Sequence, residues 1–251
     1  MQVPRNVEKL INSYFNLQIG GKIIKTPYYI NKKHSRGGEL RSLVGKGTPS
    51  EIEEEVKIFA KLRGFNLKKA SEKEIRMFMK SEGIGIDCSG LVAHILDSWL
   101  KTKNKGPLYS NLTFKNKNLL DKFIKYLRPI QNISAHLLTN EENSIPIKLS
   151  DVRVGDLLRI KGLKHGHHIA IFVSIDTDQE GRKVLKYLHS TPYYGKDNGI
   201  RFGEILIIDE NKDLDRQKWL EFDKKNICWT FKQYLKEQED NGIRRPKFFL
   251  K

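Results

Sequence analysis

The run DCSGLVAHILDSWL at residues 87–100 constrains the fold more than any other part of the sequence. Its apolar residues recur at the spacing of one helix face. They are Leu91, Val92, Ile95, Leu96 and Trp99. A helix with so broad an apolar stripe has to pack against another layer. We therefore expect a helix that begins at Cys88, is capped by Asp87 and lies on a sheet.

Capping boxes predict two further helices upstream. TPSE at 48–51 places a proline at the first helical position, and the apolar pattern then continues until Gly64. SEKE at 71–74 opens a shorter helix that continues through Met79 and ends near Gly83. Residues 1–80 are therefore expected to form a helical N-terminal extension packed on the core.

From residue 150 onward the sequence becomes rich in short β-type runs. DLLRI, HIAIFVSI, KVLKYLHS and GEILIID are separated by Gly, Asp or Asn turns, which is typical of an antiparallel sheet. The chain is thus predicted to belong to the α+β class. Residues 101–148 are expected to be a loop-rich basic insertion with one amphipathic helix around 119–127. Residues 211–251 are expected to be a C-terminal extension that closes an edge or wraps the core.

The overall composition suits a single elaborated domain. The chain has 251 residues and a hydrophobic content of 38%, enough for a sizeable core. No apolar run approaches the length of a membrane span, and the start of the chain lacks a secretory leader. Two cysteines, Cys88 and Cys228, are too few for a secreted disulfide framework. These features predict a cytoplasmic protein, with release by lysis or by a leaderless route left open.

The formal net charge of +16 favours anionic partners such as nucleic acid, anionic lipid or an acidic wall polymer. Much of it is local, since residues 101–125 contain seven lysines and a single acid, Asp121. A solvated lysine-rich surface explains the same excess. No aromatic-interleaved basic motif or zinc-finger spacing is present, which disfavours nucleic acid as the partner.

Cys88 is expected at a helix N-terminus. There, unpaired N–H groups and the helix dipole stabilise a thiolate and can also hold an oxyanion. Ser89 and Gly90 keep the first turn small enough for a substrate carbonyl to approach the backbone amides. These properties suit a catalytic nucleophile. The alternative is a small buried thiol that fills a contact between helix and sheet, the more common fate of a lone cysteine.

The strand that begins at His168 alternates between two faces. One face carries isoleucine and valine and is predicted to be core. The other begins with the His168 imidazole and continues with Ala170, which leaves room for a helix N-terminus and its thiol. His168 is therefore the candidate general base, with His167 as its rival. The alternative for His165, His167 and His168 is a polar hairpin tip or adventitious metal binding.

A second histidine ends the run KVLKYLHS. It is His189, 21 residues after His168, a separation that fits an adjacent antiparallel strand. A polar group placed there would hold the far ring nitrogen of His168 and fix its tautomer. The alternative for His189 is a polar residue that caps the end of a strand.

Three pieces in this order, DCSGLV, VGDLLRI followed by HIAIFV, and LHS followed by GIR, resemble the NlpC-type cysteine peptidases over roughly residues 81–210. The resemblance implies a papain-like α+β fold and a Cys–His–His triad. In that triad Cys88 is the nucleophile, His168 the base and His189 the residue that orients it. It also implies no metal or organic cofactor. The substrates it implies are bacterial cell-wall (peptidoglycan) peptides with D-amino acids or meso-diaminopimelate.

The chain departs from that family at one residue. Members commonly carry a tyrosine about ten residues before the signature, whereas residues 75–86 contain none. Tyr28 and Tyr29 lie roughly sixty residues upstream of Cys88, and Tyr29 is the counterpart that the resemblance suggests. Asp87 and Ser89, which flank the cysteine, complete the expected substrate and oxyanion residues.

Other functions stay open. One is an amidase or acyltransferase of the same clan that acts on another amide or ester. Another is a non-catalytic module that binds an anionic polymer through its lysines. A Cys/His/His zinc site is disfavoured, because the sequence offers no close ligand pair.

Overall fold

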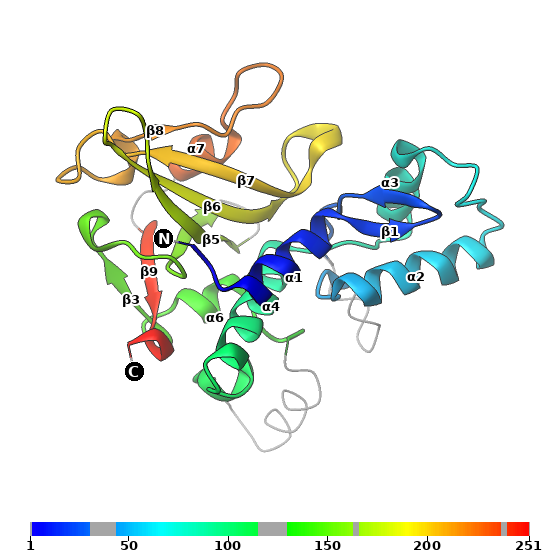
Figure 1. Ribbon diagram of the computed structural model, residues 1–251, viewed down its shortest axis with the longest axis horizontal. Coiled ribbons are helices and arrows are strands. Elements are labelled where there is room, and N and C mark those ends of the chain that lie inside the picture. Colours follow the sequence, from blue (N-terminus) through cyan, green and yellow to red (C-terminus); the bar gives the residue numbers. More distant parts are fainter. Residues whose placement is uncertain (1, 31–43, 115–129, 163–165, 237–239, 251) are drawn as a thin grey trace.

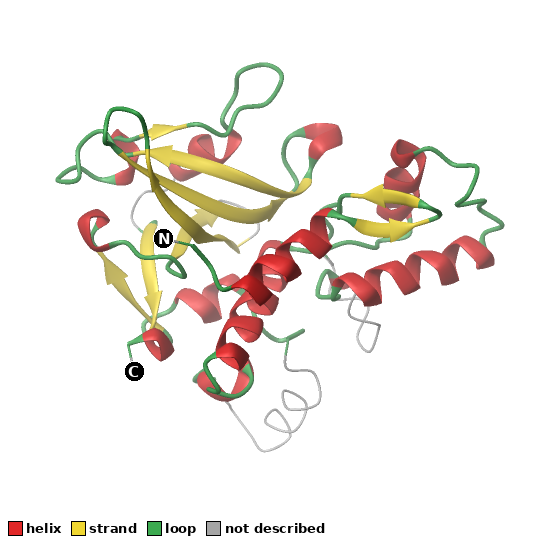
Figure 2. Ribbon diagram, viewed as in Figure 1, coloured by secondary structure: helices red, strands yellow, loops and turns green. Residues whose placement is uncertain are grey.

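The computed structural model describes residues 2–30, 44–114, 130–162, 166–236 and 240–250 (Figure 1). The helices of the first half are α1 (Arg5–Phe15), α2 (Pro49–Leu62), α3 (Glu72–Ser81) and α4 (Cys88–Thr102), with the hairpin β1 (Leu17–Ile19) and β2 (Lys22–Ile24) after α1. The second half comprises α6 (Ala135–Thr139), β3 (Ser144–Ile147), β4 (Leu157–Gly162), β5 (Gly166–Thr177), β6 (Lys183–Thr191), β7 (Gly199–Leu206), β8 (Lys218–Trp219), α7 (Trp229–Tyr234) and β9 (Gly242–Pro246). Helices dominate the first half and strands the second (Figure 2). The chain is therefore of the α+β class, as expected.

The centre of the molecule is an antiparallel sheet. Within the described residues its strand order is β3-β9-β4-β5-β6-β7-β8, and every neighbouring pair is antiparallel. The predicted antiparallel sheet is thus confirmed. Its middle consists of the hairpins β4–β5 and β5–β6, so the strands that carry the two histidines are direct neighbours.

The predicted helix boundaries are confirmed closely. Thr48 and Glu51 form a capping box at the start of α2, and Ser71 and Glu74 form another at the start of α3. Helix α4 begins at Cys88, and the Asp87 side chain accepts a hydrogen bond from the Gly90 N–H at 2.6 Å. Local hydrogen bonds between residues three apart decide these boundaries, so the sequence alone suffices to find them.

Both faces of the sheet are buried, and α4 covers one of them. Leu91 and Ile95 of α4 lie in one apolar cluster with Ile169 and Ile171 of β5. The opposite face of β5 belongs to a second cluster. Its members include Ala170, Phe172, Tyr187, Trp219 and Tyr234. The expectation that α4 would approach the His168–Ala170 face is wrong: α4 packs on the isoleucine face, and the C-terminal elements β8 and α7 cover the other.

The N-terminal part contains elements that the sequence analysis left out. Helix α1 packs along α4, between the large sheet and the end of the molecule formed by β1, β2, α2 and α3 (Figure 1). The turn of the small hairpin is Gly20-Gly21, with φ of 61° and 79°. Consecutive glycines between apolar pairs are the signal for such a tight turn, so this hairpin could have been predicted.

The last strand lies inside the sheet. Strand β9 pairs with β3 on one side and β4 on the other. The Arg245 guanidinium of β9 holds both carboxylate oxygens of the buried Asp156 at 2.8 Å. Residues 211–251, expected as an extension, therefore supply an interior strand as well as the edge strand β8. The helix expected around 119–127 lies outside the described residues.

No helix in the described part of the chain is long and apolar enough to cross a membrane.

Candidate active site

Cys88 occupies the first position of α4 and is 7% exposed. The N–H groups of Ser89 and of Ile169 in β5 lie close enough to its sulfur to lower the pKa of the thiol. Ile169 follows His168 in the chain, so the thiol lies beside the residue of β5 that comes directly after this histidine. The fold thus brings a helix N-terminus and the start of a central strand together around one sulfur atom.

The thiol of Cys88 is neutral in this environment. Burial is the main cause of its raised pKa, and the Asp87 carboxylate beside it raises the pKa further. Lys46 and the two N–H groups act in the opposite direction, and the net result is a pKa of about 12. Desolvation therefore outweighs the helix N-terminus here, and the resting side chain is a thiol.

A buried lysine connects the residues on either side of Cys88. Lys46 Nζ lies 2.9 Å from Asp87 Oδ1, contacts Ser89 Oγ, and donates to the Ile133 carbonyl at 3.0 Å. Lys46 is 6% exposed, and Asp87 and Ser89 are buried as well. The side chains of Asp87 and Ser89, expected near the substrate, are thus engaged in a buried network that holds the first turn of α4.

Gly90 is needed for close packing within the protein. A Cβ at this position would lie 2.5 Å from the Gly45 carbonyl oxygen. The space beside Gly90, which was expected to admit a substrate carbonyl, is therefore filled by the loop that carries Lys46. Among the described residues, no backbone carbonyl accepts a hydrogen bond from the Cys88 N–H.

The rings of His168 and His189 are in contact. His168 Nε2 lies 2.8 Å from His189 Nδ1, and the ring planes meet edge to face at 67°. His168 is half-buried, whereas His189 is fully buried. Among the described hydrogen bonds none joins the Cys88 thiol to the His168 ring. Ile169, whose N–H lies near the thiol, follows His168 in the chain.

The His168 imidazole is held in its neutral form. Burial lowers its pKa, and the adjacent His189 lowers it further, while Glu221 acts in the opposite direction. The resulting pKa is about 3. Near neutral pH the site therefore holds a neutral thiol and a neutral imidazole, the form in which His168 is able to accept a proton.

Glu221 is the functional residue that the sequence analysis missed. Its carboxylate is buried and lies 2.9 Å from His189 Nε2. Tyr187 and Thr230 donate to its other oxygen, each at 2.6 Å, and Arg201 forms an ion pair with it. Glu221 follows the short strand β8 in a segment with no recognisable motif, so no local pattern could have indicated it.

The tyrosine beside Cys88 is Tyr28, which corrects the expectation of Tyr29. Residue 28 bridges to Ile86 in parallel register. Burial raises the pKa of the Tyr28 phenol, and Cys88 is the next largest cause, which places the hydroxyl near the thiol. The Tyr29 ring instead lies against Gly83, where an added Cβ would be 2.9 Å from its hydroxyl.

His167, the rival base, has other partners. Its Nε2 lies 2.7 Å from Arg159 Nη2 and 3.2 Å from Asp240 Oδ2. Burial lowers the pKa of His167. The His167 ring is thus engaged by Arg159 and Asp240, away from the His168–His189 pair. His165 lies outside the described residues.

Among the described side chains, no group of three or more His, Cys, Asp or Glu is arranged to hold a metal ion.

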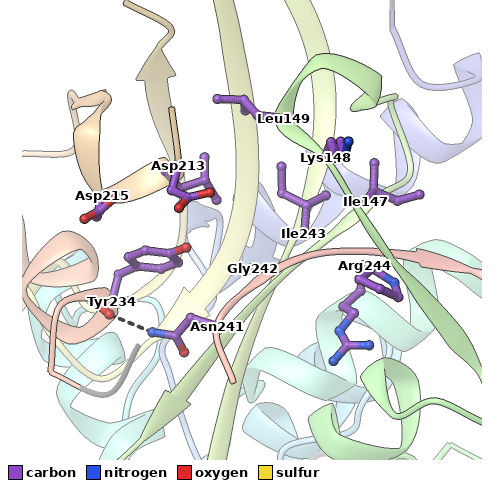
Figure 3. A pocket seen from close by; sticks show the side chains of 12 residues that line it. Ile147, Lys148, Leu149, Asp213, Asp215, Tyr234, Asn241, Gly242, Ile243 and Arg244 are labelled. Atoms are coloured by element: carbon purple, nitrogen blue, oxygen red, sulfur yellow. Dashed lines mark hydrogen bonds between the residues drawn. The ribbon is translucent and has the colours of Figure 1, made fainter. Parts of the chain in front are cut away.

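A separate cavity of about 330 Å³ lies between β3, β9 and α7 (Figure 3). Ile147, Asp213, Tyr234 and Arg244 are among the residues that line it, and Asn241 at its wall donates to the Tyr234 carbonyl at 2.6 Å. None of its lining residues belongs to the group around Cys88.

A scan against protein-family models and a search of the curated proteins found no match to this chain.

Proposed function

We propose that this protein is a cysteine hydrolase with a papain-like, NlpC-type fold that cleaves amide bonds in bacterial cell-wall peptides. The observation that carries the proposal is that Cys88, at the N-terminus of α4, lies beside Ile169 of β5, the residue that follows His168, whose ring pairs with that of His189 on β6. A thiol nucleophile requires a helix N-terminus and an oriented imidazole within reach, and these two parts support the proposal.

The proposed reaction begins with substrate binding and removal of the Cys88 proton by His168. The sulfur then adds to the amide carbonyl, and the oxyanion accepts hydrogen bonds from the Cys88 N–H and the Tyr28 hydroxyl. His168 returns the proton to the leaving amine as the C–N bond breaks, which leaves an acyl group on Cys88. Water, deprotonated by His168, hydrolyses this thioester and regenerates the thiol.

The neutral resting state fits this sequence of steps. Because burial opposes ionisation of both Cys88 and His168, proton transfer is expected once a substrate carbonyl lies close to the sulfur, so that the developing charge is stabilised at the oxyanion donors. The net charge of +16 would attract the carboxylates of an acidic stem peptide.

The test is hydrolysis of synthetic peptides that contain D-glutamate and meso-diaminopimelate, with product masses read by mass spectrometry. The native protein and Cys228→Ala are expected to cleave the peptide and to show an acyl adduct on Cys88 when quenched early. Cys88→Ala and His168→Ala are expected to lose at least about 1000-fold in rate. Cleavage that survives in Cys88→Ala contradicts the proposal.

A further inference from the structure

The contacts of Glu221 determine where the protons of the two histidines reside. The carboxylate lies on the buried end of the His168–His189 pair and is 2% exposed. A carboxylate accepts hydrogen bonds and cannot donate them. His189 Nε2, 2.9 Å from Glu221 Oε1, must therefore carry the proton of that bond.

The proton on His189 Nε2 determines the other nitrogen of the same ring. We take His189 in its neutral form, in which the ring carries a single N–H and Nδ1 presents a lone pair. This atom lies 2.8 Å from His168 Nε2. His168 Nε2 must then be the donor, which leaves His168 Nδ1 without a proton. The tautomer of the proposed base is thus fixed through two successive hydrogen bonds by Glu221, an acid that lies 32 residues beyond His189.

The surroundings of Glu221 keep it in the form that this chain of bonds needs. Burial by itself would raise its pKa, but His189 and the hydroxyls of Thr230 and Tyr187 lower it to about 2. Arg201 adds an ion pair at the same oxygen that faces His189, and its guanidinium stacks on the Tyr194 ring at 3.4 Å. The Tyr194 hydroxyl in turn lies 3.2 Å from the Glu221 carbonyl. Side chains from β6, β7 and α7 therefore converge on one carboxylate.

We infer that Glu221 is a positioning residue that selects the tautomers of His189 and His168, so that His168 Nδ1 is free to take the proton of Cys88. Its negative charge also balances the positive charge that the imidazole pair gains when that proton is transferred. The inference rests on the proposed function for the identity of the base. It extends the group of three predicted residues to a fourth, which never touches the substrate.

The test is the tautomeric state of both rings in the native protein, measured by ¹⁵N-detected imidazole spectroscopy near neutral pH. The expected result is a protonated Nε2 and an unprotonated Nδ1 on both His168 and His189. A proton on Nδ1 of His168 in the native protein overturns the inference, whether or not the peptide is cleaved. This measurement needs no variant and no substrate.

Variants then separate positioning from folding. Glu221→Ala removes the acceptor, so folded protein is expected to show a second tautomer at His168 and at least a 10-fold lower kcat. Glu221→Asp keeps a carboxylate and is expected to retain more of the native tautomer and rate than Glu221→Ala. Glu204→Ala, which removes an exposed carboxylate from β7, is the control and is expected to change neither.

The outcomes distinguish the two proposals. If the native protein has the expected tautomers but cleaves no peptide, the proposed function fails and the assignment of Glu221 stands. If Glu221→Ala folds with unchanged His168 tautomer and native kcat, the positioning role is refuted and the proposed function stands. If Glu221→Ala does not fold, the spectrum of the native protein decides.

Discussion

At the scale of single residues, burial governs the chemistry of the site. Cys88 and His168 both favour their neutral forms because burial opposes their ionisation, Cys88 at the contact between α4 and β5 and His168 beside the His189 ring. Glu221 is the exception, since hydrogen bonds and nearby positive charge overcome the same burial. The result is one fixed negative charge at Glu221, with a neutral His168 imidazole and a neutral Cys88 thiol in the same site.

This arrangement predicts a protein that loses stability in acid. Glu221 has a pKa of about 2 and His168 a pKa of about 3, against ordinary values of 4.5 and 6.5. Both pKa values are lowered on folding, so the unfolded chain binds more protons. The stabilisation is complete above about pH 6.5 and is lost as the pH falls toward 2; the part from Glu221 is on the order of 3 kcal/mol.

Urea unfolding at a series of pH values measures this loss. The midpoint is expected to fall progressively below pH 6.5, and His168→Gln is expected to show less of the fall between pH 6.5 and 4. A midpoint in the native protein that stays constant from pH 7 to 4 would contradict the environment described for both residues.

The two adjacent tyrosines offer a sharp comparison at this scale. Tyr28 lies near the Cys88 thiol, while Tyr29 packs against Gly83. Tyr28→Phe is expected to lower kcat by about 100-fold, because it removes one oxyanion donor, with little change in thermal stability. Tyr29→Phe is the matched control and is expected to stay within a few-fold of the native kcat. Equal losses in the two variants would refute the assignment of Tyr28.

At the scale of elements, the start of α4 depends on a loop distant in sequence. The Asp87 cap and the apolar stripe define the helix locally, but its first turn is fixed by Lys46 and by the Gly45 carbonyl. Helix α4 therefore places Cys88 accurately only when residues 45–47 are in position beside it.

Gly90→Ala tests this dependence. Alanine is the better helix former by about 1 kcal/mol, so the substitution would stabilise an isolated helix. Here the added methyl would lie 2.5 Å from a backbone oxygen, which cannot rotate away. We expect the clash to dominate and the free energy of unfolding to fall by about 1–3 kcal/mol. Ser50→Ala in the first turn of α2 is the exposed control, and a Gly90→Ala protein as stable as that control would show that the loop yields.

At the scale of the whole molecule, the C-terminal segment completes both the sheet and the site. Strand β9 lies between β3 and β4, and Glu221 follows β8 at the far end of the sheet. The early helices and the late strands therefore form one structure around α4 and β5, and buried residues of the C-terminal segment, such as Trp219, Tyr234 and Ile243, belong to its core.

Ile243→Asp tests the interior position of β9. Ile243 is 4% exposed and pairs with Ile147 and Leu158 on its two sides. A carboxylate there would be buried without a partner, so we expect a loss of more than about 4 kcal/mol, or failure to fold. Ile208→Asp, at a residue 55% exposed, is the control and is expected to unfold near the native Tm. A well-folded Ile243→Asp protein would place β9 outside the core.

The sequence by itself determined the elements whose signals are local. The capping boxes of α2 and α3, the Asp87 cap and the period-two strands depend on residues two to four positions apart, and each was found close to its observed place. The nearness of His168 and His189 also followed, because a short hairpin joins their strands. Such contacts need little chain closure, so the pattern of the residues decides them.

Only the tertiary structure decided which distant side chains complete the site. Glu221 reaches His189 across 32 residues, Lys46 reaches Asp87 across 41, and Ser190 reaches the Ile86 carbonyl across 104. The position of β9 inside the sheet, and the choice of the β5 face that α4 covers, also depend on contacts between residues far apart in the sequence. No periodicity encodes such contacts, because they depend on how the whole core packs and on the burial that follows from it.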